Sequence, residues 1–158
     1  MDPELRRAVQ TLALAGRGLE RAAAPLTLPQ YRVLALVASA PERASRLATQ
    51  VDVTKAALTG VLDALEVHGW IERAVVAGDR RGVSLTVTAT GAAALESAEE
   101  AMGAWLAEVL GSGPGDTTTT DAEASRAVLR GLCALGGALG RHRRQRMEDG
   151  VGAVGGRR

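Results

Sequence analysis

Hydrophobic residues recur along most of the chain at steps of three and four, which is the spacing of one face of an α-helix. Alternation at period two occurs only between Trp70 and Thr88, in two runs separated by a polar hairpin tip at residues 77–82. The sequence therefore predicts a mainly α fold with one small, two-stranded antiparallel sheet. The predicted helices cover residues 3–23, 27–39, 43–51, 55–68, 88–110 and 120–147.

Residues typical of helix ends mark several of these boundaries. Thr27 and Gln30 have the spacing of a capping box, in which each side chain bonds the backbone of the other, and Pro29 suits the first turn. A second capping box is predicted from Thr120 to Glu123. Two further N-caps and one C-cap are predicted at Thr54, Thr88 and Gly69.

The helices predicted over 43–51 and 55–68 are joined by a tight turn, which makes them a helix-turn-helix, and the hairpin follows at once. A helix-turn-helix followed by a hairpin is a winged helix. In such an arrangement the N-terminal residues of the second helix lie nearest the base edges of the major groove. The candidate DNA contacts are Thr54, Lys55, Ala57 and Thr59, with Ser45 as a phosphate contact.

Helices at the two ends of the chain carry narrow apolar stripes. A stripe of this width requires a partner helix, in the same chain or in another. We expect one domain over residues 1–148, with the winged helix at about 27–88, and a disordered tail at 149–158. The stripes consist of Leu5, Val9, Leu12, Gly16, Leu19 and Ala23 in the first helix, and of Ala124, Val128, Leu132, Leu135 and Leu139 in the last.

The formal net charge of +1 hides an uneven distribution. Residues 96–125 carry seven acidic and no basic side chains, whereas residues 126–158 carry eight basic and two acidic ones. This pattern fits intermolecular pairing or a polyanion contact, and it fits equally a solvated acidic face followed by a basic helix end. The predicted recognition helix carries Lys55 against Asp63 and Glu66, and this excess of acid predicts either weak DNA binding or reliance on the wing.

The signatures of the common enzyme and cofactor sites are absent from the sequence. Lys55 is the only lysine and lacks the glycine spacing of a phosphate loop, while His68 and His142 lack zinc-ligand spacing. The sequence therefore predicts no enzyme, no metal and no cofactor. The single cysteine, Cys133, excludes an internal disulfide, fits a reducing cytoplasm, and is expected to be buried and inert beside Leu132.

No apolar run approaches the roughly 18 residues of a membrane span, and residues 1–7 are charged with no apolar stretch behind them. We therefore expect a cytoplasmic protein without membrane contact.

Three segments carry a resemblance to a known family. LTLPQYRVLALV (26–37), VTKAALTGVLDALEVHGWIER (53–73) and GDRRGVSLTVTATG (78–91) are similar to the second helix, recognition helix and wing of the MarR family of bacterial transcription regulators. The order of elements over residues 3–147 resembles that family as well. Residue types of the family pattern occur at Thr59, Asp63, Leu65, Glu66, Gly69, Glu72 and Arg73.

The resemblance implies a homodimer in which the helices at 3–23, 88–110 and 120–147 interlace. It implies further that Arg81 enters the minor groove, that Asp79 holds Arg81 in place, and that Arg80 binds a phosphate. Family members bind small aromatic or phenolic effectors, and Tyr31 and Trp105 are the candidate walls of such a pocket, or else core and interface anchors.

We therefore expect a ligand-responsive repressor that binds double-stranded DNA. Its pseudo-palindromic operator would be read by the recognition helix at 54–68 and the wing at 77–82. The alternative is an effector-binding or protein-interaction module on the same scaffold with weak DNA affinity.

Overall fold

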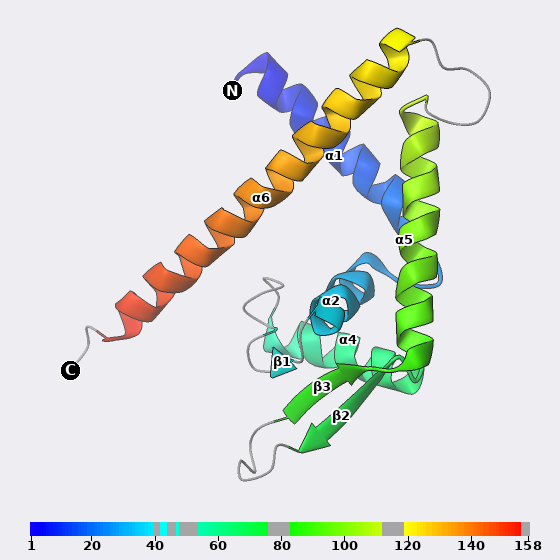
Figure 1. Cartoon of the computed structure of the whole chain (residues 1–158). Helices are drawn as coiled ribbons and strands as arrows, with labels where there is room; N and C mark the ends of the chain where they lie inside the picture. Colours follow the sequence, from blue (N-terminus) through cyan, green and yellow to red (C-terminus); the bar gives the residue numbers. More distant parts are fainter. Residues whose placement is uncertain (40–41, 44–46, 48–53, 76–82, 112–118, 156–158) are drawn as a thin grey trace. The chain divides into compact units, whose positions relative to one another are not determined.

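The computed structural model describes residues 1–39, 42–43, 47, 54–75, 83–111 and 119–155. These residues form five helices and three strands, in two compact units, Met1–Leu106 and Ala107–Arg158. The mainly α architecture with a small antiparallel wing is confirmed (Figure 1). The prediction of a single domain over 1–148 is not tested by this division and stays a prediction.

The first two helices begin where local side chains satisfy free backbone N–H groups. Helix α1 (Pro3–Ala22) starts after Asp2, whose carboxylate accepts from the backbone N–H of Glu4 at 2.8 Å. Helix α2 (Leu28–Ser39) starts at the predicted capping box. The backbone N–H of Thr27 donates to Gln30 Oε1 at 2.8 Å, and the N–H of Gln30 donates to Thr27 Oγ1 at 3.4 Å.

Helix α4 (Lys55–Val67) begins at its predicted N-cap, and its C-cap is His68, one residue before the predicted Gly69. Thr54 Oγ1 accepts from the backbone N–H of Ala57 at 3.2 Å, which makes Thr54 the N-cap. The helix closes through His68, and Gly69 then adopts a φ of +68°, a left-handed conformation that glycine reaches without a steric cost. This turn directs the chain from the helix into the sheet.

The sheet contains one strand that the sequence pattern did not predict. Strands β2 (Ile71–Val75) and β3 (Val83–Val87) pair antiparallel as expected, and β1 (Glu42–Arg43) pairs with the other edge of β3. The prediction that strand signals occur only at 70–88 is therefore wrong, and Arg43 lies in a strand instead of starting a helix. A strand of two residues is too short to show alternation, and its pairing depends on the free edge of β3. Of the rest of the predicted helix at 43–51, only Leu47 is described, and it is helical.

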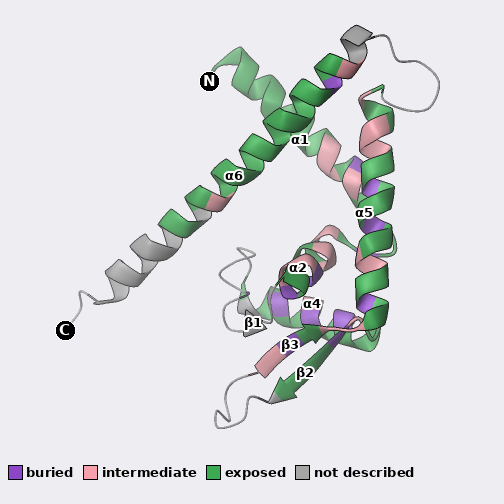
Figure 2. Ribbon diagram, viewed as in Figure 1, coloured by how far each residue is buried: buried purple, intermediate pink, exposed green. Residues whose placement is uncertain are grey.

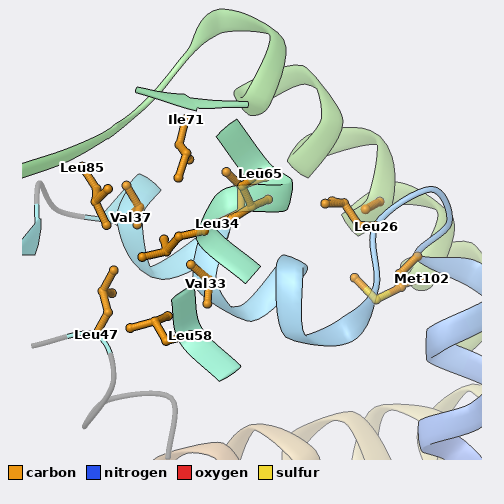
Figure 3. Close-up of a cluster of buried hydrophobic side chains, with 13 residues drawn as sticks. Leu26, Val33, Leu34, Val37, Leu47, Leu58, Leu65, Ile71, Leu85 and Met102 are labelled. Atoms are coloured by element: carbon orange, nitrogen blue, oxygen red, sulfur yellow. The ribbon is translucent and has the colours of Figure 1, made fainter. Parts of the chain in front are cut away.

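The hydrophobic core of the first unit lies mainly between α2, α4 and the sheet. Helix α2 contacts α4 and β3, and α4 contacts β2, so one face of α4 is fully covered (Figures 2 and 3). Leu34, Leu65 and Leu85 are each completely buried, one from each of these layers. The remaining core side chains are Ala23, Leu26, Val33, Val37, Leu47, Leu58, Leu62, Ile71, Ala98 and Met102.

Helix α5 (Ala89–Val109) begins with a close backbone contact. Thr88 Oγ1 caps it by accepting from the N–H of Gly91 at 3.0 Å. The hydroxyl groups of Thr88 and Thr90 donate to the carbonyl of Gly69 at 2.6 and 2.8 Å, which ties the first turn of α5 to the turn after α4. A Cβ on Gly91 would lie 2.0 Å from the carbonyl oxygen of Trp70, so only glycine fits there.

Helix α6 (Thr119–Gly155) is longer than predicted. It starts one residue before the expected cap Thr120 and continues through residues 149–155, where we expected a disordered tail; that expectation is wrong for these residues. After Pro114 the chain contains no proline, so nothing in the sequence interrupts the i to i−4 hydrogen bonds. Within the same unit, Ser125 Oγ donates to the carbonyl of Leu110 at 2.8 Å.

Candidate nucleic-acid interface

The face of α4 that points away from the core is the candidate DNA-reading surface. Leu58, Leu62 and Leu65 hold the inner face in the core, which leaves the outer face exposed. Among the predicted DNA contacts, Thr54, Ala57 and Thr59 lie together, exposed, at the N-terminal end of the helix. Lys55 is the first residue of α4. The structure thus brings the described candidates to one end of one helix, as a recognition helix requires.

The hairpin beyond α4 sets the position of the wing. Ile71 pairs with Val87 and Val75 pairs with Val83, so residues 76–82 are the connection between two registered strands. The predicted wing contacts Asp79, Arg80 and Arg81 belong to this connection and lie outside the described residues, as does Ser45. Their DNA-binding roles stay predictions.

Sequence reasoning did not predict the ion pairs of Arg73. From β2, Arg73 Nη2 contacts Asp63 Oδ1 at 2.5 Å, and Arg73 Nε contacts Glu66 Oε2 at 3.2 Å. Both carboxylates belong to the exposed side of α4. The sequence did contain a signal for these ion pairs. Arg73 follows the turn at Gly69 by only four residues, so β2 can run back beside the C-terminal end of α4.

Tyr31 and Trp105, the two candidate effector residues, have different partners. Tyr31 Oη donates to Glu99 Oε1 at 3.3 Å, which links α2 to α5. The ring of Trp105 lies against Gly18 of α1, where a Cβ would come within 2.0 Å of ring atom Cζ2. Trp105 therefore packs between α1 and α5. A role in effector binding stays a prediction for both Tyr31 and Trp105.

The Tyr31 hydroxyl is held in its neutral form. Partial burial raises its pKa above the ordinary value of 10.0, and the nearby Glu99 carboxylate, both through its charge and through the hydrogen bond, raises it further. A raised folded-state pKa means that the contribution of Tyr31 to stability is complete below pH 10 and is lost as the pH rises through the higher, folded value.

We therefore expect Tyr31 to ionise above pH 10 in the folded protein. Because it is the only tyrosine, an absorbance titration at the tyrosinate band reports this residue alone. Glu99→Gln should lower the midpoint, though not to the unfolded value, since burial is the largest cause of the shift. The same titration in urea is the reference, and a folded midpoint at or below that reference would contradict the expectation.

The remaining candidates for metal or redox chemistry are Cys133 and the possible metal-ligating side chains. Cys133 is exposed in this chain, so the expectation that it is buried is wrong; the leucines beside it on α6 are only partly covered. Across the described part of the chain, no group of three or more His, Cys, Asp or Glu side chains is placed to hold a metal ion. His68 stacks on Trp70 with ring centroids 4.4 Å apart.

None of the described helices is both long enough and apolar enough to cross a bilayer.

Part of this sequence matches a known family, and the fold is similar to that of solved structures. The model of the MarR family matches residues 26–83, which contain α2, α4, β2 and the start of β3. No curated protein sequence gives a significant match. The chain is similar in structure to a mutant of MarR from Escherichia coli complexed with operator DNA. The TM-score is 0.59 at 26% identity, over 82% of this chain and 94% of that one.

Two further solved structures extend the comparison. A MarR family protein from Mycobacterium tuberculosis, in complex with p-aminosalicylic acid, is 27% identical with a TM-score of 0.61, over 83% of this chain and 98% of that one. A MarR family transcriptional regulator from Streptomyces coelicolor, in complex with DNA, has a TM-score of 0.61 over 82% of both chains. At 19% identity it shows the common fold.

Proposed function

We infer, from the premise that this chain belongs to the MarR family of DNA-binding transcriptional regulators, that it is a cytoplasmic, homodimeric repressor. Each subunit would place α4 in the major groove of one half of a pseudo-palindromic operator, with the wing in the adjacent minor groove. A small aromatic effector would release the protein from DNA. The observation that carries this proposal is the outer face of α4, which presents Thr54, Ala57 and Thr59 at its N-terminal end.

The proposed dimer is supported by apolar side chains that this chain leaves exposed. Leu5, Val9 and Leu12 of α1 are each at least half exposed, at the positions of the predicted stripe. Helix α6 likewise leaves its stripe exposed over several turns, and single chains of soluble proteins rarely do so (Figure 2). A second copy of the chain, which carries the same stripes, would cover both helices. On the described part of α6, the large apolar residues that are exposed are Val128, Leu129, Leu132, Leu135 and Leu139.

The proposed effector response is supported by the link between α2 and α5. The Tyr31–Glu99 hydrogen bond joins the winged helix to a long helix that we assign to the dimer. The relative from Mycobacterium tuberculosis is complexed with p-aminosalicylic acid, an aromatic acid. A ligand of this class that competes for Tyr31 would change how the winged helix is held on α5, and with it the spacing of the two recognition helices.

The acidic side chains Asp63 and Glu66 on the exposed face of α4 favour a second candidate, a protein- or effector-binding module with weak DNA affinity. The two candidates differ in whether the protein selects a DNA sequence. Selection from a random library of duplexes tests this directly. The repressor proposal expects an enriched, pseudo-palindromic sequence with half-sites about one helical turn apart, or a multiple of it, whereas the second candidate expects no enrichment.

Replacing Arg81 with alanine should weaken binding to the selected duplex by about 10- to 100-fold, since a specific groove contact is lost. The matched control is Arg32→Ala on the exposed side of α2, which removes the same charge outside α4 and the wing. Fluorescence anisotropy at fixed salt measures both variants. Equal affinity for the two would count against the role assigned to Arg81 and the wing.

A further inference from the structure

The DNA-facing side of α4 carries more acid than a DNA-binding helix should tolerate. Thr59, Asp63 and Glu66 are spaced by four and three residues, so they lie on one side of the helix, and all three are exposed. Two carboxylates on this side would repel the phosphates that flank the groove. Lys55, at the start of the helix, can offset only one of them.

Arg73 provides the missing positive charge from outside the helix. Its guanidinium bridges both carboxylates, through Nη2 to Asp63 and through Nε to Glu66. The Arg73 side chain is 29% exposed, whereas those of Asp63 and Glu66 are 56% and 46% exposed, so the cation is the most covered of the three groups. A bridging, partly covered guanidinium of this kind holds its geometry better than a single surface pair.

The sheet register explains why Arg73 reaches α4. Arg73 pairs directly with Leu85, and Ile71, two residues earlier, pairs with Val87. Directly paired residues point to the same face of a sheet, and Leu85 and Ile71 are both buried in the core. Arg73 therefore occupies a core-facing strand position, from which its side chain extends past the apolar layer to the outer carboxylates of the helix.

We propose that Arg73 is a positioning residue for DNA binding, which acts by neutralising Asp63 and Glu66 so that α4 can approach the phosphate backbone. The proposal rests on the proposed DNA-binding function and deepens it. Lys55 and Arg73 together balance Asp63 and Glu66, so these four residues carry no net charge. The excess of acid in the recognition helix is thus compensated by the strand that leads to the wing.

The test compares three full-length proteins with wild type, on the selected duplex and on a random-sequence duplex of the same length. Arg73→Gln removes the cation that bridges Asp63 and Glu66, and it leaves one excess negative charge among the four residues. Arg73→Gln/Asp63→Asn/Glu66→Gln removes the cation and both anions with little change in size. Arg32→Gln removes one positive charge elsewhere and serves as the matched control. Circular dichroism and thermal unfolding confirm that each protein is folded.

Arg73→Gln should bind about tenfold more weakly than wild type at about 0.05 M salt, and the deficit should shrink to about threefold or less near 0.3 M salt, because repulsion between exposed charges is screened. The triple variant should bind at least as tightly as wild type. If the triple variant regains DNA affinity, and if the deficit of Arg73→Gln shrinks with salt, then Arg73 acts by compensating charge. A purely structural role of Arg73 would produce neither result.

The inference is overturned if Arg73→Gln binds as tightly as Arg32→Gln, or if the triple variant stays as weak as Arg73→Gln. Failure of the proposed function has a different signature. A wild-type protein that binds both duplexes equally overturns operator recognition, while the same order of variants on the random duplex still supports the role of Arg73.

Discussion

Replacing Leu132 with glutamate should convert the protein to a monomer and remove its tight binding to DNA. Leu132 lies in the middle of the exposed apolar stripe of α6, and 40% of its surface is accessible in this chain. In the proposed dimer this surface would be covered by the second copy. Each dimer would then contain two unpaired carboxylates in an apolar contact, and an uncompensated buried charge costs several kcal/mol.

The expected loss has two parts. The dimer dissociation constant should rise by more than about a hundredfold, since about 1.4 kcal/mol corresponds to each factor of ten. A monomer holds a single half-site, so the affinity for the full operator should fall by about 10²- to 10⁴-fold when the second, linked contact is lost. Sedimentation at micromolar concentration and anisotropy on the selected duplex measure the two effects separately.

Ala134→Glu is the matched control for Leu132→Glu. Ala134 is exposed, and it lies on the side of α6 that carries Arg130 and Arg141, away from the leucine stripe. The same new charge at this position should leave the oligomeric state unchanged. A Leu132→Glu protein that sediments like wild type would contradict the assignment of α6 to the dimer, and a wild-type monomer would contradict the dimer itself.

Gly91→Ala should strongly destabilise the fold. The new Cβ would lie 2.0 Å from the carbonyl oxygen of Trp70, a backbone atom that cannot rotate away. Either the first turn of α5 or the end of α4 must shift, at a cost of about 3 kcal/mol, the upper end of the usual range for overpacking. Urea denaturation measures the free energy of unfolding, with unchanged m-value as a check on the unfolded state.

Gly60→Ala, a glycine-to-alanine change in another helix, should stabilise the fold instead of destabilising it. A Cβ at Gly60 has no heavy atom within 4 Å, and the position is inside α4. Alanine should therefore stabilise the helix by about 0.5–1 kcal/mol, because glycine loses more backbone entropy on folding. A Gly91→Ala protein as stable as wild type would show that the contact between Gly91 and Trp70 is easily relieved.

Local hydrogen bonding made much of the fold predictable. The caps at Thr27, Thr54 and Thr88 each join groups three residues apart, so the residue types at that spacing indicate where α2, α4 and α5 begin. The order of a helix-turn-helix followed by a hairpin also indicated a winged helix, because both motifs are recognised from short stretches of sequence. For the candidate site, spacing correctly placed Thr54, Ala57 and Thr59 at the exposed start of α4.

Contacts between distant residues were not predictable in this way. The hydrogen bond between Tyr31 and Glu99 spans 68 positions, and β1 exists only because the edge of β3 lies beside it. The exposure of a side chain also depends on contacts between distant residues. Cys133 was expected to be buried because its neighbours in sequence are apolar, but it is exposed, because burial depends on what covers α6. No local pattern contains this information.

The sequence by itself indicated the resemblance to the MarR family, the order of most elements and the start of α4, because caps, helical periodicity and strand alternation act over a few residues. Only the tertiary structure decided how Asp63 and Glu66 are compensated. From the sequence, these two charges oppose DNA binding, whereas in the structure both form ion pairs with Arg73 of β2. Electrostatic energy depends on separation in space, and folding brings together charges that the sequence keeps apart.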